Sequence, residues 1–189
     1  MRDFLRLDAA ACLLGALLIM TLPLRWLFAA LTAAVFHEFC HFLAVKLLGG
    51  KVLDVCIGPG GAVMQTLPMS RGREFLCALA GPMGSILLVC LCRTFPRVAF
   101  CALVQAAYNL LPVFPLDGGR ALRCALERLT PKWADRICRW VETGTLAALG
   151  VAALIASFWK RLGIMPLIVF LLLAMKRNRP CKLRRFRVQ

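Results

Sequence analysis

Long apolar runs separated by short polar segments recur along the whole chain, and they constrain its fold more than any other feature. Hydrophobic residues make up 61% of the sequence, and the mean hydropathy is +0.77. A soluble domain is only about half apolar. Because one crossing of the bilayer takes about 20 residues, a chain of 189 residues holds about six crossings with little left over. The sequence therefore predicts a membrane protein without a sizeable extramembrane domain.

The expected fold is an all-α polytopic membrane protein with about six transmembrane helices. We expect spans at 9–24, 26–48, 75–92, 98–114, 143–158 and 162–175. After the second span, β-type residues surround a Gly-Pro-Gly-Gly turn signal, which predicts a small membrane-associated β-hairpin within 51–65. Residues 119–141 are basic and amphipathic, with Pro131 dividing them, which predicts two interfacial helices.

These elements predict a single integral-membrane domain over residues 1–175. Its core is expected at 26–120, the interfacial helices at 119–141, and a basic cytoplasmic tail at 176–189. Several apolar runs are shorter than an ideal span, so the boundaries are good only to about two to four residues.

The formal net charge of +15 has two readings. Clustered basic side chains serve nucleic-acid binding, but they also mark the cytoplasmic loops of membrane proteins. With six spans and both termini inside, 19 of the 24 Lys and Arg residues fall on the inner side and five on the outer side. This distribution predicts a multi-pass protein with both termini cytoplasmic, and it argues against nucleic-acid binding.

His37-Glu38-Phe39-Cys40-His41 lies in the second predicted span and is the strongest chemical signal in the sequence. On a helix, residues four apart share a face, so both imidazoles can reach one metal ion. Glu38 lies beside such an ion, where it can accept a proton from activated water. Ionisable residues inside a membrane span usually carry function. The alternative is that the two histidines are packed core residues and Glu38 is their structural partner.

A catalytic zinc site normally has three protein ligands, so a third is needed. Asp117 is the best candidate, because prolines and glycines around it would unwind a helix at the inner end of the fourth span. The second and fourth spans run in the same direction, which brings both motifs to the cytoplasmic half. The alternative is that Asp117 only caps the following helix.

The pair HEFCH and NLLPVFPLDGGR resembles the motifs of the site-2 protease family of intramembrane metalloproteases. A third segment, Ala80-Gly81-Pro82-Met83-Gly84-Ser85, is similar to the family's glycine-proline motif. Ser85 stands where Asn is usual, so the resemblance implies only a weakened polar role at that position. The compact layout is similar to the branch of stage IV sporulation protein FB, but neither the CBS domain common in that branch nor the PDZ domain of the envelope-stress branch is recognisable.

The resemblance implies one Zn²⁺ per chain held by His37, His41 and Asp117, with Glu38 as general base. It implies that Asn109 orients the substrate or stabilises the oxyanion. The implied activity is regulated intramembrane proteolysis of a transmembrane or membrane-associated protein. We further expect a bacterial cell membrane, contact with membrane lipids, and either a regulatory membrane partner or self-association.

Three other functions compete with this interpretation. A prenyl-protein type metalloprotease would need a downstream Glu ligand, and Glu74, Glu127 and Glu142 lie in no matching motif. A non-catalytic membrane scaffold would not require Glu38. Metal transport would need more than one ligand cluster. For the hairpin, strand addition to an unwound substrate and simple filling of the cavity remain equal alternatives.

Overall fold

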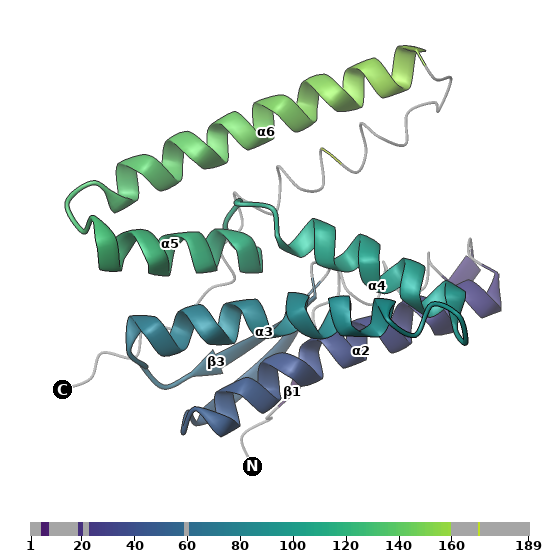
Figure 1. Cartoon of the computed structure of the whole chain (residues 1–189), viewed down its shortest axis with the longest axis horizontal. Helices are drawn as coiled ribbons and strands as arrows, with labels where there is room; N and C mark the ends of the chain where they lie inside the picture. Colours follow the sequence, from purple (N-terminus) through teal and green to yellow (C-terminus); the bar gives the residue numbers. More distant parts are fainter. Residues whose placement is uncertain (1–4, 8–18, 21–22, 59–60, 160–169, 171–189) are drawn as a thin grey trace.

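The computed structural model describes residues 5–7, 19–20, 23–58, 61–159 and 170, and it is mostly helical (Figure 1). The helices are α2 (Leu24–Leu47), α3 (Arg71–Val89), α4 (Pro96–Asn109), α5 (Asp117–Leu129) and α6 (Ala134–Trp159). The strands are β1 (Leu5–Leu7), β2 (Val52–Gly58) and β3 (Gly61–Thr66). Helix α3 is central, because it contacts α2, α4 and α5.

Helix α2 has sharp sequence signals at both ends. It begins directly after Pro23, which cannot donate a backbone hydrogen bond. At the other end, Gly49 has a φ of 75°, and its N–H donates to the carbonyl of Lys46. The N–H of Gly50 donates to the carbonyl of Val45, which completes a Schellman motif. The helix that carries the His-Glu-x-x-His motif is therefore fixed in length.

Helices α2, α3 and α4 pack through small buried residues. Ala33 of α2, Leu88 of α3 and Ala102 of α4 form one core cluster, and both alanines are fully buried. Small side chains let helix backbones approach closely, as they do in membrane proteins. A second cluster joins Val113 and Leu116, before α5, to Leu146 of α6. The second cluster thus anchors the segment that leads to Asp117 against α6.

The outer faces of the helices are apolar. Phe28, Leu31, Val35 and Phe39 follow one face of α2, and each is more than half exposed. Within the part of the chain that the structure describes, three helices are long and apolar enough to cross a membrane, at Leu24–Leu47, Arg71–Val89 and Ala134–Ser157. The chain is therefore a membrane protein, in agreement with its composition. Most of the predicted first span, nearly all of the predicted sixth span and the whole of the predicted basic tail lie outside the described residues.

The fourth predicted span, 98–114, differs from the structure. Helix α4 has only 14 residues and ends at Asn109. Pro112 and Pro115 follow, and proline neither donates to a helical carbonyl nor tolerates a helical residue before it. The chain then starts again as α5, which lies lengthwise along α3 and runs in the opposite direction (Figure 1). The prediction of an unbroken span to 114 is wrong by five residues at its inner end.

The predicted interfacial helices at 119–141 also differ in part. The first corresponds to α5, but the second does not end near 141. Helix α6 runs without a break from Ala134 to Trp159, so it combines that segment with the predicted fifth span. Nothing between Val141 and Thr145 interrupts the helix, because Gly144 costs only about 1 kcal/mol relative to Ala.

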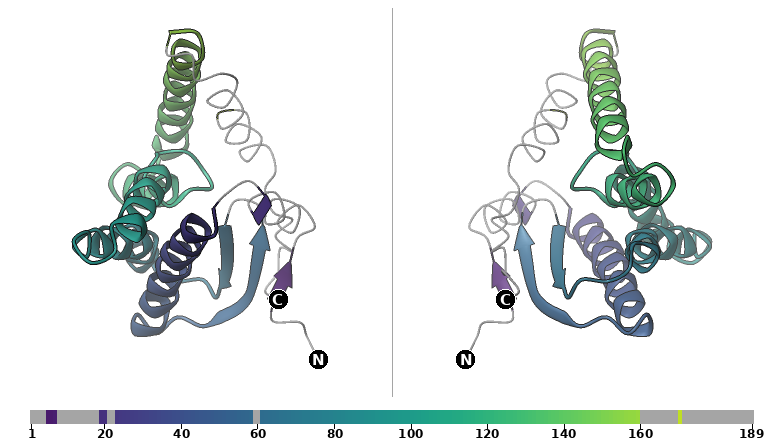
Figure 2. Two further views of the ribbon diagram at one scale, coloured as in Figure 1. Left: turned by 90° about the vertical axis from the view of Figure 1, so that its right-hand side faces the viewer. Right: turned by 90° about the vertical axis from the view of Figure 1, so that its left-hand side faces the viewer.

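The strands form a three-stranded sheet in the order β1-β2-β3. Strands β2 and β3 are antiparallel, with Val55 opposite Met64, in the segment where the hairpin was predicted. Strand β1 pairs with β2 in parallel, which the sequence did not indicate. The sheet lies beside α2, and β3 contacts that helix (Figure 2). Its association with the membrane stays a prediction.

Candidate metal centre

Helix α2 presents His37 and His41 on one face, one turn apart. Their Nε2 atoms lie 3.2 Å from each other, and the two rings meet edge to face with centroids 4.9 Å apart. His37 is almost fully buried and His41 is partly buried. The four-residue spacing thus brings two nitrogen donors to one point, as the sequence predicts.

Asp117 reaches the same point from α5. Its Oδ2 atom lies 3.1 Å from the Nε2 atom of His37 and 3.1 Å from that of His41. Its Oδ1 atom faces Arg120 at 3.9 Å. The N-cap residue of α5 is Leu116 and not Asp117, so the structure gives no support to a purely capping role. The carboxylate instead closes a triangle with the two imidazoles.

Close backbone packing places Asp117 there. A Cβ atom at Gly118 would overlap the carbonyl oxygen of Leu110. A Cβ at Gly119 would lie 2.5 Å from the carbonyl carbon of Val113. The two glycines after the aspartate therefore let the first turn of α5 pack directly on the segment that leaves α4. This explains in physical terms why they follow the aspartate.

Helix α3 supports both imidazoles from behind. The Oγ atom of Ser85, which is fully buried, pairs with Nδ1 of His37 at 2.8 Å. The Nδ1–H of His41 donates to the carbonyl oxygen of Cys77 at 2.7 Å. Because a carbonyl only accepts, Nδ1 of His41 carries the proton, and in the neutral ring Nε2 has a free lone pair. Gly81 lies against both Nε2 atoms, where a Cβ would overlap His41.

This arrangement suits a metal ion. A lone pair on Nε2 of His41 only 3.1 Å from a carboxylate oxygen is repulsive unless a proton or a cation lies between them. The three donor atoms lie within 4.8 Å of one another. A tetrahedral zinc ion with bonds of about 2.0–2.1 Å needs donor separations of about 3.3 Å. The observed separations of 3.1–3.2 Å fit such an ion with small adjustments.

The charge state of Asp117 agrees with a ligand role. When the imidazoles are protonated and no metal ion is bound, burial disfavours the ionised form of Asp117, but the hydrogen bonds and charges of His37 and His41 outweigh the burial. Together they hold the pKa of Asp117 well below its usual range. The residue is therefore a carboxylate at neutral pH, with one oxygen directed at the two imidazoles.

Two further predicted residues lie at or beside the triangle. The side-chain nitrogen of Asn109, the last residue of α4, lies 3.4 Å from Nε2 of His37. Glu38 is partly buried and follows His37 directly on α2. Of the five residues predicted from the sequence, the structure brings His37, His41 and Asp117 into mutual contact and places Asn109 against His37, with Glu38 adjacent in the chain.

Sequence reasoning missed the support from α3. The usual Asn of the glycine-proline motif is replaced by Ser85, and from this we expected a weaker polar role at that position. The hydroxyl nevertheless pairs with His37. The role of the Cys77 carbonyl had no side-chain signal to reveal it. The close approach of Gly81 to the two imidazoles was indicated in the sequence only by the presence of a glycine at that position.

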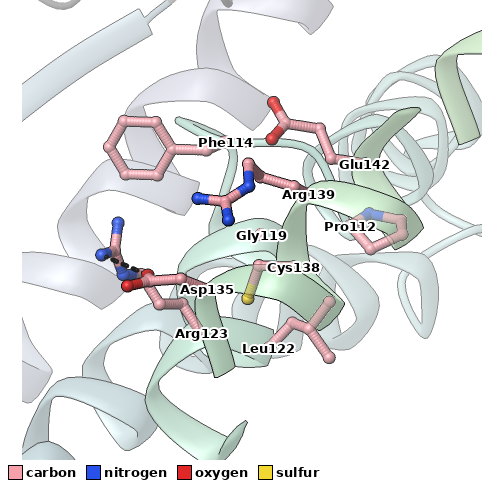
Figure 3. Close-up of a pocket in the computed structure, with 9 residues that line it drawn as sticks. All are labelled: Pro112, Phe114, Gly119, Leu122, Arg123, Asp135, Cys138, Arg139 and Glu142. Atoms are coloured by element: carbon pink, nitrogen blue, oxygen red, sulfur yellow. Dashed lines mark hydrogen bonds and ion pairs between the residues drawn. The ribbon is translucent and has the colours of Figure 1, made fainter. Parts of the chain in front are cut away.

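A separate cavity of about 320 Å³ is lined in part by Pro112 and Phe114, in the segment between α4 and α5 (Figure 3). It is bounded by that segment, by α5 and by the first turns of α6, with the Arg123–Asp135 ion pair at its edge. None of the three donor residues lines it. The cavity is therefore not the metal centre.

Apolar helices built around a His-His-Asp triangle define a class of membrane metalloproteases. Residues 9–113 match the family described as Peptidase M50B-like, and the chain belongs to this family of site-2 proteases. The chain is 30% identical over 110 residues to the zinc metalloprotease MJ0392 of Methanocaldococcus jannaschii. That match covers 51% of this chain and 32% of the relative, so the chain spans about a third of the curated relative it matches.

The fold is also that of a known protease. The structure of the site-2 protease from Methanocaldococcus jannaschii superposes with a TM-score of 0.67 and 21% sequence identity. The match covers 92% of this chain and 88% of that chain. At this identity the likeness shows the fold, and the chemistry of this chain has to be argued from its own residues.

Proposed function

We propose that this chain is an intramembrane zinc metalloendopeptidase in which His37, His41 and Asp117 hold one Zn²⁺ ion. The observation that carries the proposal is the convergence of two imidazole nitrogens and one carboxylate oxygen within 3.2 Å of one another. Zinc bound to three protein ligands lowers the pKa of a coordinated water toward about 7 and polarises a carbonyl group. The name of the curated relative supports the choice of metal.

The other catalytic roles in this proposal belong to residues of the chain itself. Glu38 is the general base, which takes a proton from the attacking water and passes it to the leaving amine. In this proposal the Asn109 amide, whose nitrogen lies 3.4 Å from Nε2 of His37, donates a hydrogen bond to the substrate carbonyl oxygen as negative charge develops on it. Ser85 and the Cys77 carbonyl hold the two imidazoles in orientation through their Nδ1 atoms.

The substrate in this proposal is a transmembrane or membrane-associated protein. The apolar outer faces of the helices support contact with lipid and with an apolar substrate helix. A helical substrate must unwind before its peptide bond can be attacked. Strand β3 is at the end of the described sheet order, so it offers an edge on which an unwound segment can add as a further strand. Cavity filling by the sheet is the competing role.

The proposed setting is a bacterial cell membrane, with several spans and both termini in the cytoplasm. The excess of Lys and Arg in the inner segments supports this orientation. A regulatory membrane protein or a second copy of the chain is the proposed partner besides the substrate.

The alternative function is a non-catalytic scaffold or regulator with the protease fold. Glu38 separates the two, because an inactive scaffold does not need a base next to His37. Single-span candidate substrates are co-expressed with the wild type or with Glu38→Gln, and their cleavage is followed by immunoblot. The wild type should cleave at least one of them, and Glu38→Gln should reduce the rate by about 10²–10⁴-fold. Zinc content should stay near one per chain in both, because Glu38 is not a ligand.

Equal processing by the wild type and Glu38→Gln would remove Glu38 from catalysis. Loss of zinc together with activity in Glu38→Gln would instead identify Glu38 as a ligand.

A further inference from the structure

Two ion pairs between helices and two within helices form a connected group on α3, α5 and α6, away from the metal centre. Glu127 of α5 is at their middle, because one carboxylate oxygen lies 2.8 Å from Nε of Arg71 and the other lies 2.9 Å from Nε of Arg123. Arg71 also pairs with Glu74 at 3.0 Å, and Arg123 with Asp135 of α6 at 3.0 Å. The side chain of Glu127 is only 20% exposed. One of its oxygens therefore joins α5 to α3, and the other holds Arg123, which itself pairs with Asp135 of α6.

The ion pairs and the metal centre are at matching positions on two antiparallel helices. On α3, Arg71 comes ten residues before Gly81, which touches both imidazoles. On α5, Glu127 comes ten residues after Asp117. Ten helical residues span about 15 Å. The Arg71–Glu127 contact at one end and the His–Asp contacts at the other therefore specify the same register of α5 along α3.

Apart from a contact of 3.7 Å between the Cys124 thiol and the Glu74 carboxylate, little else between α3 and α5 fixes that register. The buried residues of α5 other than Asp117 are Gly118, Gly119, Ala121 and Cys124, all of them small. The corresponding buried residues of α3 include Cys77, Ala78 and Gly81. Small side chains allow close approach but form shallow ridges and grooves, which resist sliding weakly. A displacement of about 1 Å along the axis is enough to disturb a metal or catalytic site.

We propose that Glu127 is a positioning residue. By pairing with Arg71 it sets the register of α5 on α3 and so holds the Asp117 carboxylate against His37 and His41. The proposal rests on the proposed function only in that a metal ion is bound at the triangle. Glu127 touches neither substrate nor metal, so its effect is measured first as metal affinity.

The test uses the full chain in detergent micelles and measures the zinc dissociation constant by competition with a chelator. Glu127→Gln keeps the size of the side chain and removes its charge. It should raise the dissociation constant about three- to tenfold, which corresponds to one or two partly exposed ion pairs. Arg71→Gln should weaken binding in the same direction. The matched control is Arg73→Gln, an exposed residue two positions from Arg71 on the same helix, which should stay within twofold of the wild type.

A double-mutant cycle and a salt titration make the test specific. If the two residues act through their contact, Arg71→Gln adds nothing in the Glu127→Gln background. Raising the salt concentration from 0.05 to 1 M should weaken zinc binding by the wild type and leave Glu127→Gln unchanged in the same buffers, because salt screens partly exposed pairs. The salt titration of the wild type needs no variant, so the positioning role remains testable even if one of the variants fails to fold.

The outcomes separate the two proposals. A wild type that binds no zinc overturns the proposed function. Three results would each overturn the positioning role alone, provided that the wild type binds zinc. They are equal zinc affinities of the wild type and Glu127→Gln, additive effects of the two substitutions on zinc affinity, and a wild-type zinc affinity that does not depend on salt.

Discussion

Gly81 shows how one missing side chain shapes the metal centre. Its Cα lies against the Nε2 atoms of both imidazoles, and a methyl group there would overlap His41. Gly72, on the same helix, has only ordinary contact with Arg128, at 3.6 Å from an added Cβ. The two glycines therefore have the same helix propensity but different surroundings.

This pair gives a matched prediction. Alanine is favoured over glycine inside a helix by about 1 kcal/mol, so both substitutions strengthen α3 intrinsically. Gly81→Ala should nevertheless lower zinc affinity by at least about tenfold, as displaced supporting contacts do. Gly72→Ala should keep zinc binding and cleavage at wild-type levels. Zinc bound by purified protein is the measurement, and equal binding by the two variants would contradict the arrangement of α3 behind the imidazoles.

Comparing the wild type with Asp117→Asn distinguishes a metal-ligand role of Asp117 from a helix-capping role. A neutral amide is a poor zinc donor, so Asp117→Asn should weaken both zinc binding and cleavage, and Asp117→Ala should weaken them further. As helix caps, Asp and Asn are about equally good. Metal content and substrate cleavage are measured on the same preparations. Wild-type values of both in Asp117→Asn would remove Asp117 from the site.

How far the site is predictable from the sequence depends on the kind of contact. His37 and His41 follow from helical spacing, and Asp117 follows from a helix break placed where a third ligand was needed. The pairing of Ser85 with His37 depends on how α3 is rotated against α2, which only tertiary packing decides. The Cys77 carbonyl is a backbone group that every residue type has, so its hydrogen bond with His41 cannot be predicted from the sequence.

At the scale of elements, the helix breaks were harder to predict than the helices. The apolar runs indicated α2, α3 and much of α6, but hydropathy does not distinguish α4 from the apolar segment that follows Asn109. The continuation of α6 through residue 142 was missed because its charged first turns resemble a surface helix. Strand β1 was missed because three residues are too short to show alternation, and its partner β2 lies far away in the sequence.

The turn between α5 and α6 gives a prediction about orientation. Trp133 is 55% exposed there, and the guanidinium of Arg136 lies 4.9 Å above its ring centroid. Aromatic and basic side chains of this kind gather at the membrane surface. Among the six basic residues of 119–141, Arg123 already pairs with Glu127 and Asp135. Arg128, Lys132, Arg136 and Arg139 are therefore the better candidates for anionic lipid, each contributing about 1 kcal/mol.

Cysteine labelling tests this orientation. In a variant without the native cysteines, Lys132→Cys should not react in intact cells with a membrane-impermeant maleimide, and it should react after permeabilisation. Arg97→Cys, at an exposed position in the first turn of α4, should react from outside. Labelling of position 132 from outside would reverse the proposed topology, including the cytoplasmic placement of both termini.

For the whole molecule, the metal centre connects helices that are otherwise held by small residues and partly exposed ion pairs. His37 and His41 belong to α2, Asp117 belongs to α5, and α3 lies between them as the common support. A ligand that binds only the folded state stabilises it in proportion to the logarithm of its concentration over its dissociation constant. The ion should therefore contribute to global stability as well as to catalysis.

We predict about one zinc ion per purified chain, because three converging donors form one site. At free zinc about 1,000-fold above the dissociation constant, the folded state should gain about 4 kcal/mol over the metal-free protein. Chelation should lower the thermal midpoint, and amide exchange should increase first in the opening turn of α5, which loses the bond that holds Asp117. The double variant His37→Ala, His41→Ala should melt like the chelated wild type and gain nothing from added zinc. Zinc content near one per chain in that variant would place the ion elsewhere and leave the triangle without its proposed role.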